Sequence, residues 1–244
     1  MNLRPFFCYY GGKWRAAPHY PAPTHDIIVE PFAGAAGYAT RYADRRVLLV
    51  ERDPTIANLW KYLTRVTPAE ILALPALVPG TVDDLPICQE ARWLIGFWCN
   101  QGTSAPRKSP SAWMRSRARP KSYWGAEVRA ILAAQVEAIR HWKVIEGSYE
   151  SAPDGEATWF IDPPYQLAGK HYRHRLNEGE YNHLGRWCRA RRGQVMVCEN
   201  VGATWLPFEP WRKTQGTPGA RGGWVSDEAI WTGDVSVAHT EYVG

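Results

Sequence analysis

The sequence Asp-Pro-Pro-Tyr at residues 162–165 has the residue types and spacing best suited to bind a small ligand. The apolar run 159–161 precedes it and predicts a buried strand. Because proline lacks an N–H and fixes φ, the chain should leave this strand on a stiff path, with Pro163 held extended by Pro164. We therefore expect a carboxylate, backbone carbonyls and an aromatic ring at the carboxyl end of a strand, where open α/β sheets bind ligands.

These groups suit a flat ring that carries an amine. Asp162 and the carbonyl of Pro163 can each accept a hydrogen bond from an exocyclic NH2 group, and Tyr165 can stack on the ring. An ordinary Pro-Pro turn with a capping aspartate is the alternative, and this stretch alone leaves that alternative open.

The elements that must position this site alternate between strands and helices, which predicts the α/β class. Strands are predicted at 27–29, 46–51, 143–148, 158–162, 194–199, 208–214 and 226–232, the last two joined as a hairpin whose tip carries Arg221. Helices are predicted at 38–45, from Pro54 onward, and up to about Arg192, where Gly193 should end the helix. Asp53 is the expected N-cap of the second helix, with Pro54 at its first position.

Small residues follow the first predicted strand, where Gly34 and Gly37 flank two alanines. Such a turn lets a ligand approach the backbone, but the glycine spacing differs from G-x-G-x-x-G and disfavours a dinucleotide oxidoreductase. Glu30 ends the first strand and could hold an ammonium group. Glu51 ends the second strand, at the position that holds a ribose diol in nucleoside-binding α/β sheets.

An N-terminal segment, Tyr-Gly-Gly-Lys at residues 10–13, offers a tight backbone followed directly by a cation. Lys13 could neutralise a carboxylate while Tyr10 packs against a ligand. A glycine turn with a solvated lysine is the alternative, and the sequence does not decide between the two.

Between residues 66 and 142 helical spacing continues without strand patterns, most clearly at 87–98 and 128–142. The stretch 101–124 lies between these two patterns and has six basic residues, interleaved aromatic residues and no acid. Its bases are Arg107, Lys108, Arg115, Arg117, Arg119 and Lys121. Prolines and serines argue against a helix through this stretch. Nucleic-acid contact is favoured over a solvated basic loop because aromatic residues lie among the basic residues.

A second polar stretch, 166–182, is expected to form a mobile loop beside the site, with Lys170 and Arg173 available to phosphates. His171, His174 and His183 are interpreted as phosphate contacts or surface residues, since no acid or cysteine completes a metal-ligand set.

Composition sets broader limits. The 244 residues carry a formal net charge of +5, which mildly favours a polyanionic partner. The five cysteines show neither C-x-x-C nor metal-ligand spacing, so we expect reduced thiols. We see no apolar run long enough to span a membrane and no signal-peptide pattern, and therefore expect a soluble cytoplasmic protein.

Three motifs in order, YGGK, EPFAGAAG and DPPY, resemble those of the Dam-type (D12 class) DNA adenine-N6 methyltransferases. The resemblance covers residues 5–65 and 143–232, while 66–142 has only the position of that family's target-recognition region. It implies a Rossmann-like class I methyltransferase fold, with a mixed seven-stranded sheet and helices on both faces. It also implies a catalytic core of residues 1–65 and 143–244, interrupted by a helical target-recognition insertion at 66–142.

The resemblance implies S-adenosylmethionine as cofactor and roles for individual residues. Tyr10, Gly12 and Lys13 would lie near the methionine end of the cofactor. The cofactor turn would comprise Glu30, Pro31, Phe32, Ala33, Gly34 and Gly37, with Glu51 and Arg52 at the ribose. The target adenine would meet Asp162, Pro163, Pro164 and Tyr165, with Asp162 also bordering the cofactor. Many relatives carry an acid after the third strand for the cofactor adenine, a contact that Ser148, Tyr149 or backbone atoms would replace here.

Double-stranded DNA is the implied partner, and the implied source is a bacterium or a phage. DNA contacts are expected from Arg107, Lys108, Arg115, Arg117, Arg119, Lys121, Lys170 and Arg173. We expect a monomer without a metal. The recognition site, and any role in restriction-modification, stay open.

Three other functions use similar residues. A cytosine-N4 methyltransferase usually carries SPPY rather than DPPY. An RNA adenine methyltransferase and a catalytically silent nucleic-acid-binding protein also fit, although the intact Asp162, Tyr165 and glycine turn favour an active enzyme.

Overall fold

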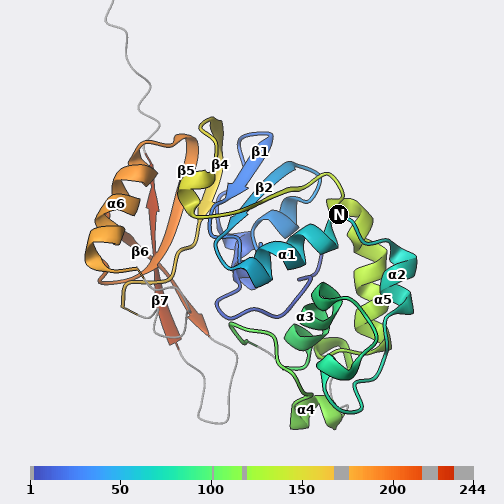
Figure 1. Cartoon of the computed structure of the whole chain (residues 1–244). Helices are drawn as coiled ribbons and strands as arrows, with labels where there is room; N and C mark the ends of the chain where they lie inside the picture. Colours follow the sequence, from blue (N-terminus) through green and yellow to red (C-terminus); the bar gives the residue numbers. More distant parts are fainter. Residues whose placement is uncertain (1–2, 101, 117–119, 168–175, 216–224, 234–244) are drawn as a thin grey trace, which may run out of the picture.

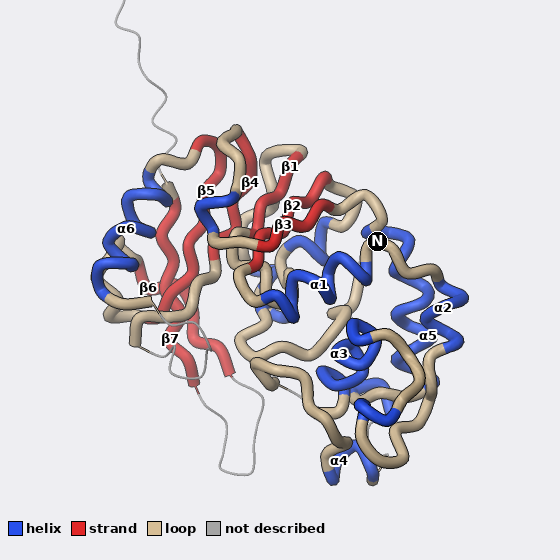
Figure 2. The backbone as a smooth tube through the Cα atoms, in the orientation of Figure 1, coloured by secondary structure: helices blue, strands red, loops and turns tan. Residues whose placement is uncertain are grey.

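The computed structural model describes residues 3–100, 102–116, 120–167, 176–215 and 225–233, and within them a mixed seven-stranded sheet (Figures 1 and 2). The strands are β1 (Ile27–Glu30), β2 (Arg46–Glu51), β3 (Lys143–Glu146), β4 (Glu156–Ile161), β5 (Arg192–Asn200), β6 (Glu209–Gln215) and β7 (Val225–Thr232). Their order is β3-β2-β1-β4-β5-β7-β6. Neighbours among β1–β5 pair in parallel, whereas β7 is antiparallel to both β5 and β6. The predicted α/β class, mixed sheet and closing hairpin are confirmed.

Both faces of the central strands are buried, because their alternate side chains enter two different clusters. Ile28 and Phe160 belong to the first cluster, and their neighbours Val29 and Trp159 belong to the second. Helix α1 (Pro54–Leu63) buries its predicted apolar face in the first cluster. Helix α6 (Glu178–Arg189) contributes to the second cluster. Helices therefore cover both faces of the sheet.

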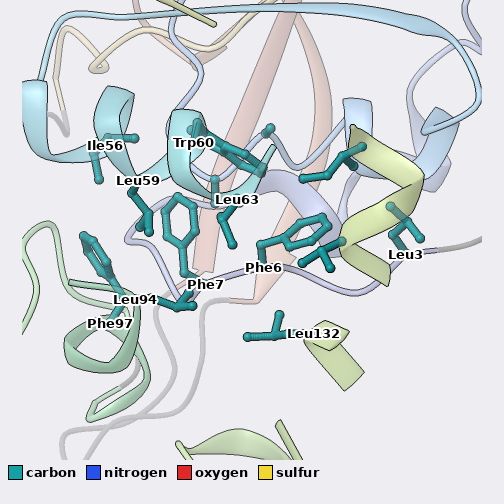
Figure 3. Packing of buried hydrophobic residues seen from close by; sticks show 14 of the residues in the cluster. Leu3, Phe6, Phe7, Ile56, Leu59, Trp60, Leu63, Leu94, Phe97 and Leu132 are labelled. Atoms are coloured by element: carbon teal, nitrogen blue, oxygen red, sulfur yellow. The ribbon is translucent and has the colours of Figure 1, made fainter. Parts of the chain in front are cut away.

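The first cluster also unites the sheet with the middle of the chain. Figure 3 shows Phe6 and Phe7 beside Trp60 of α1, and their ring centroids lie 5.6 and 5.4 Å from that of Trp60. Leu94 of α3 (Gln89–Trp98) and Leu132 of α5 (Ala126–Gln135) join the same cluster. With α2 (Pro68–Ala73) and α4 (Ala112–Arg115), these helices lie together at one side of the molecule (Figure 1). Residues 66–142 therefore share a core with the sheet.

Several local predictions need correction. Residues 38–45 form only a 3-10 turn at Ala39–Tyr42, since β2 begins soon afterwards. The helical pattern at 128–142 is α5 followed by a 3-10 turn at Val136–Ile139, and the stretch 101–124 includes the single turn α4 and a 3-10 turn at Pro120–Ser122. Residues 178–182 begin α6 and are not loop.

Gly193 does not end the α6 helix, which stops at Arg189. Gly193 lies inside β5 with a φ of 98°, and an added Cβ would collide with the Ala157 carbonyl of β4. By contrast, α1 begins as predicted, because Asp53 accepts a hydrogen bond from the Thr55 N–H at 2.8 Å and Pro54 follows it.

All five cysteines are free thiols. Among the residues that the structure describes, no helix combines the length and the apolar character that a bilayer crossing requires. The same residues contain no group of three or more His, Cys, Asp or Glu side chains arranged to hold a metal ion. The predicted hairpin tip with Arg221 lies outside the described residues.

Candidate ligand-binding site

A cavity of about 550 Å³ opens at the carboxyl ends of the central parallel strands. From β1 the chain moves outward to β2 and β3, and then returns to β4 on the other side of β1. The strand order thus reverses between β1 and β4, which is where ligands bind in open α/β sheets. Every residue that the sequence assigned to the cofactor lines this cavity: Tyr10, Gly12, Lys13, Glu30, Pro31, Phe32, Ala33, Gly34, Gly37, Glu51, Arg52, Ser148, Tyr149 and Asp162.

The glycine turn after β1 is held by contacts within the protein. Gly34 adopts a φ of 44°, and its N–H donates to Oε2 of Glu51 at 2.9 Å. Its carbonyl accepts a hydrogen bond from Nε1 of Trp60 at 2.8 Å. At Gly37, an added Cβ would lie 2.5 Å from the backbone nitrogen of Trp14. Gly37 is therefore required because the N-terminal segment packs directly against the turn.

The Glu51 side chain connects this turn to the start of α1 through hydrogen bonds. Its Oε1 accepts from the Asp53 N–H at 2.9 Å, while its Oε2 accepts from Gly34. Burial raises the pKa of Glu51, and these backbone hydrogen bonds oppose the rise. The backbone N–H of Arg52 also lowers this pKa, and with four lone pairs in all the carboxylate keeps acceptor capacity for a ligand hydroxyl.

Glu30 is more deeply buried than Glu51 and holds the same turn. It is 2% exposed, and its Oε1 accepts a hydrogen bond from the Ala39 N–H at 2.6 Å. Burial raises the pKa of Glu30 to about 8, and the backbone N–H groups of Ala39 and Tyr38 oppose this rise. Contact with an ammonium group stays a prediction.

An aromatic wall closes the side of the cavity next to β3. Phe32 stacks on Tyr149 with centroids 5.4 Å apart, and the Tyr149 hydroxyl lies 2.7 Å from Nδ1 of His183 on α6. Ser148 donates to Oε2 of Glu150 at 3.2 Å. Glu150 also lines the cavity, so an acid does follow the third strand, four residues after its end.

Sequence reasoning missed part of the lining: Tyr9, Gly11, Ala35, Asp53, Glu150, Phe160, Leu176, Asn177, Gly179, Glu180 and His183. Glu150 could have been found by reading two residues beyond Ser148. The residues from 176 to 183 surround the start of α6, where Asn177 and Glu180 form a capping box. That pattern predicts a helix start but says nothing about which cavity the helix borders.

A buried ion pair forms the floor of the cavity at the end of β4. Nζ of Lys13 lies 3.1 Å from Oδ1 of Asp162 and 3.8 Å from Oε2 of Glu228. Lys13 is only 9% exposed, so the alternative of a solvated lysine is wrong. Burial raises the pKa of the Asp162 carboxyl, and Lys13 opposes that rise while the nearby Glu228 adds to it.

The rest of the Asp-Pro-Pro-Tyr motif is tied into the protein. Pro164 lines the cavity, and its carbonyl accepts a hydrogen bond from the Tyr181 hydroxyl at 2.6 Å. Pro163 is buried, and neither it nor Tyr165 belongs to the cavity lining. Nζ of Lys13 lies 4.7 Å from the Tyr165 ring centroid, so any stacking on Tyr165 in this arrangement would use the opposite ring face. The motif is thus held by contacts within the protein on both sides of Pro164.

The predicted DNA-contacting residues fall into two groups. Arg107, Arg115 and Lys121 are exposed, and Lys108 forms an exposed ion pair with Asp83 at 2.8 Å. Arg117, Arg119, Lys170 and Arg173 lie outside the described residues, as do His171 and His174.

The basic stretch is joined to the N-terminal segment. The Tyr10 N–H donates to the Thr103 carbonyl at 3.1 Å, and Tyr10 also lines a second cavity of about 410 Å³ with residues 102–107. The stretch therefore begins at the rim of the main cavity.

No protein-family model matches this chain, and no curated protein matches it significantly.

Proposed function

We propose that this chain is an S-adenosylmethionine-dependent DNA adenine-N6 methyltransferase, with a class I methyltransferase fold of the Dam type that its motifs resemble. One observation carries the proposal. A single cavity at the strand-order reversal is bounded by the Glu51-anchored glycine turn at one side and by the Asp162 carboxylate of the Asp-Pro-Pro-Tyr motif at the other.

The residues present fit S-adenosylmethionine. A volume of about 550 Å³ is within the usual range for small-ligand sites. Glu51 offers acceptors for a ribose diol, the stacked pair of Phe32 and Tyr149 offers an apolar face for an adenine ring, and Glu150 offers an acceptor for its amine. Lys13 and Tyr10 would face the methionine end.

The target amine is a poor nucleophile because its lone pair is delocalised into the adenine ring. When bound, the cofactor would supply a methyl group on a sulfonium sulfur, which leaves as a neutral thioether. The methylated nitrogen would then release one of its protons to solvent. Asp162 accepts a hydrogen bond from the amine, favours a more tetrahedral nitrogen and aims its lone pair. Lys13 supports this role because its ammonium opposes the rise in the Asp162 pKa and so favours the ionised, accepting form.

The adenine must leave the duplex to reach this cavity, at a cost of a few kcal/mol. The exposed basic side chains of the 101–124 stretch can offset part of that cost by contacting DNA phosphates beside the cavity rim. This arrangement supports residues 66–142 as the target-recognition insertion.

The direct test is transfer of tritiated methyl groups from S-adenosylmethionine to DNA and, separately, to RNA. We expect label in DNA, recovered as N6-methyladenine. Label recovered as N4-methylcytosine, or only in RNA, would change the substrate. Binding to nucleic acid with no label in either would indicate a catalytically silent binder. Single-molecule sequencing of DNA from expressing cells would then give the recognition site.

Replacing Glu51 with Gln should weaken cofactor binding by about 1.5–3 kcal/mol, the usual value of a hydrogen bond to a charged group. Gln has one acceptor oxygen where Glu51 now serves two backbone N–H groups and, as proposed, the ribose. Calorimetry with S-adenosylmethionine measures the change. Glu146→Gln is the matched control, since Glu146 ends neighbouring β3 and pairs with Lys61 at 2.8 Å without lining the cavity. Equal affinities in both variants would contradict the assignment.

Replacing both Arg107 and Arg115 with Gln should weaken DNA binding and flatten its salt dependence. If each arginine contacts one phosphate, the slope of log affinity against log salt should fall by about two units, one for each contact. Fluorescence anisotropy across a salt series measures this slope. Arg45→Gln, at the amino edge of the sheet where Arg45 pairs with Asp26, should leave the slope unchanged. An unchanged slope in the double variant would show that this stretch is only a solvated surface. A changed site preference instead would identify base reading.

A further inference from the structure

Glu228 is a buried acid that belongs to none of the sequence motifs. It lies on β7, opposite Asn200 of β5 and Arg212 of β6, and is 7% exposed. Because β7 is antiparallel to β5, Glu228 stands near the carboxyl end of β5. It therefore reaches the same edge of the sheet as Asp162, although the two lie 66 positions apart in the chain.

The Glu228 carboxylate contacts two of the groups that surround Asp162. Its Oε2 accepts a hydrogen bond from the Tyr165 hydroxyl at 2.8 Å and lies 3.8 Å from Nζ of Lys13. Lys13 in turn lies 3.1 Å from Asp162 and stands over the face of the Tyr165 ring. One oxygen atom thus links the aromatic ring of the motif to the cation that pairs with the motif's carboxylate.

We infer that Glu228 is a positioning residue of the base-binding site, holding the Tyr165 ring and the Lys13 ammonium in place around Asp162. This inference rests on the proposed methyltransferase function and adds the hairpin strand β7 to its site. A ring fixed through its hydroxyl loses little conformational freedom when a base binds, which is how preorganised sites gain affinity. Glu228 does not itself contact the base in this scheme.

The charges of the cluster make the inference testable. Titratable groups from several elements interact with the Asp162 carboxyl. They are Lys13 and Tyr20 of the N-terminal region, Glu30 of β1, Tyr165 of the motif itself, Cys198 and Glu199 of β5, and Glu228 of β7. Asp162 must be ionised to accept a hydrogen bond from the target amine, so activity should fall as the pH drops through the pKa of Asp162. The negative charge of Glu228 raises that pKa, and loss of the charge should therefore move the acid limb of the pH profile to lower pH.

Three variants separate charge from geometry. Glu228→Gln keeps the size and an acceptor oxygen but removes the charge, so the acid limb should move down by roughly half a pH unit or more. Glu228→Asp keeps the charge but shortens the side chain by one methylene. The acid limb of the pH profile should therefore stay at the same pH, while kcat/KM falls. Tyr165→Phe removes only the hydroxyl and should lower kcat/KM about 10-fold, the loss expected for a hydrogen bond to a charged group.

A double-mutant cycle tests whether Glu228 acts through Tyr165. Adding Tyr165→Phe to Glu228→Asp should cost clearly less than the sum of the two single effects, because both changes remove the Tyr165–Glu228 contact and only Tyr165→Phe also removes the hydrogen bond that lowers the pKa of Asp162. Asp227→Asn is the matched control, since Asp227 is the exposed neighbour on β7 and pairs only loosely with Lys213 at 3.9 Å. It should match the parent in kcat/KM and in pH profile.

The measurements are tritiated-methyl transfer to DNA from pH 5 to 9 for every variant, with thermal unfolding to confirm folding. If Glu228→Gln does not fold, Glu228→Asp and Tyr165→Phe still carry the cycle. If the parent is active and all three variants keep its kcat/KM and pH profile, the inference about Glu228 is wrong while the proposed function stands. An additive cycle overturns the link through Tyr165. An inactive parent overturns the proposed function and, with it, this inference.

Discussion

Replacing Asp162 with Asn should lower methyl transfer to DNA about 10²–10³-fold, the usual cost of losing one group from a preorganised polar site. Asn offers one acceptor oxygen and an amide that would repel the amine hydrogens. It also leaves Lys13, now 3.1 Å from Asp162, without its nearest carboxylate. Single-turnover transfer of tritiated methyl groups measures the change, and a fully active variant would contradict the mechanism.

The same substitution should leave the fold intact and change how its stability depends on pH. The folded-state pKa of Asp162 is raised above its unfolded value of about 3.9, so the folded protein binds the proton more tightly. The contribution of Asp162 to stability is therefore lost as pH rises through the folded pKa. Relative to the parent, Asn at this position should gain stability as pH increases above about 4.

Thermal unfolding of parent and variant between pH 4 and 8 tests that sign. Cofactor affinity, measured by calorimetry, should stay near the parent value, which separates a loss of chemistry from a loss of binding. Asp26→Asn is the control, because Asp26 is exposed beside β1 at the opposite edge of the sheet and pairs with Arg45. It should change neither the rate nor the pH dependence.

Replacing Gly37 with Ala should destabilise the protein and impair the cavity together. The new Cβ would lie 2.5 Å from the Trp14 nitrogen and 2.8 Å from the Lys13 carbonyl carbon, both backbone atoms that cannot rotate away. Relief requires the N-terminal segment to move off the turn. We expect a loss of about 1–3 kcal/mol, typical of overpacking in a well-packed interior. Because Lys13 moves with this segment, cofactor affinity should fall at least about 10-fold, or 1.4 kcal/mol.

Denaturant unfolding and calorimetry with S-adenosylmethionine measure the two effects. Gly155→Ala provides the matched control, since nothing lies within 4 Å of a Cβ at that glycine. It should be close to neutral in both measurements. Parental stability and affinity in the Gly37 variant would show that the segment and the turn are not packed as tightly as the structure indicates.

The sequence by itself determined most of the strands and the acids at their ends. Burial and β-branching are local properties, so the runs that became β1, β2 and β4 could be recognised one at a time. Because parallel strands share one carboxyl edge, Glu30, Glu51 and Asp162 could be expected to converge. The start of α1 was equally predictable, since Asp53 caps it through contacts with its own neighbours.

Only the tertiary structure decided which distant segments complete the site. Glu228 arrives on an antiparallel hairpin strand and His183 on α6, and neither has a local pattern that points to Asp162 or Tyr149. The contact of Gly37 with the N-terminal segment likewise joins residues more than twenty positions apart. Local sequence encodes backbone preference and burial, whereas long-range neighbours follow from strand order and from the packing of whole faces, which no single stretch of the chain contains.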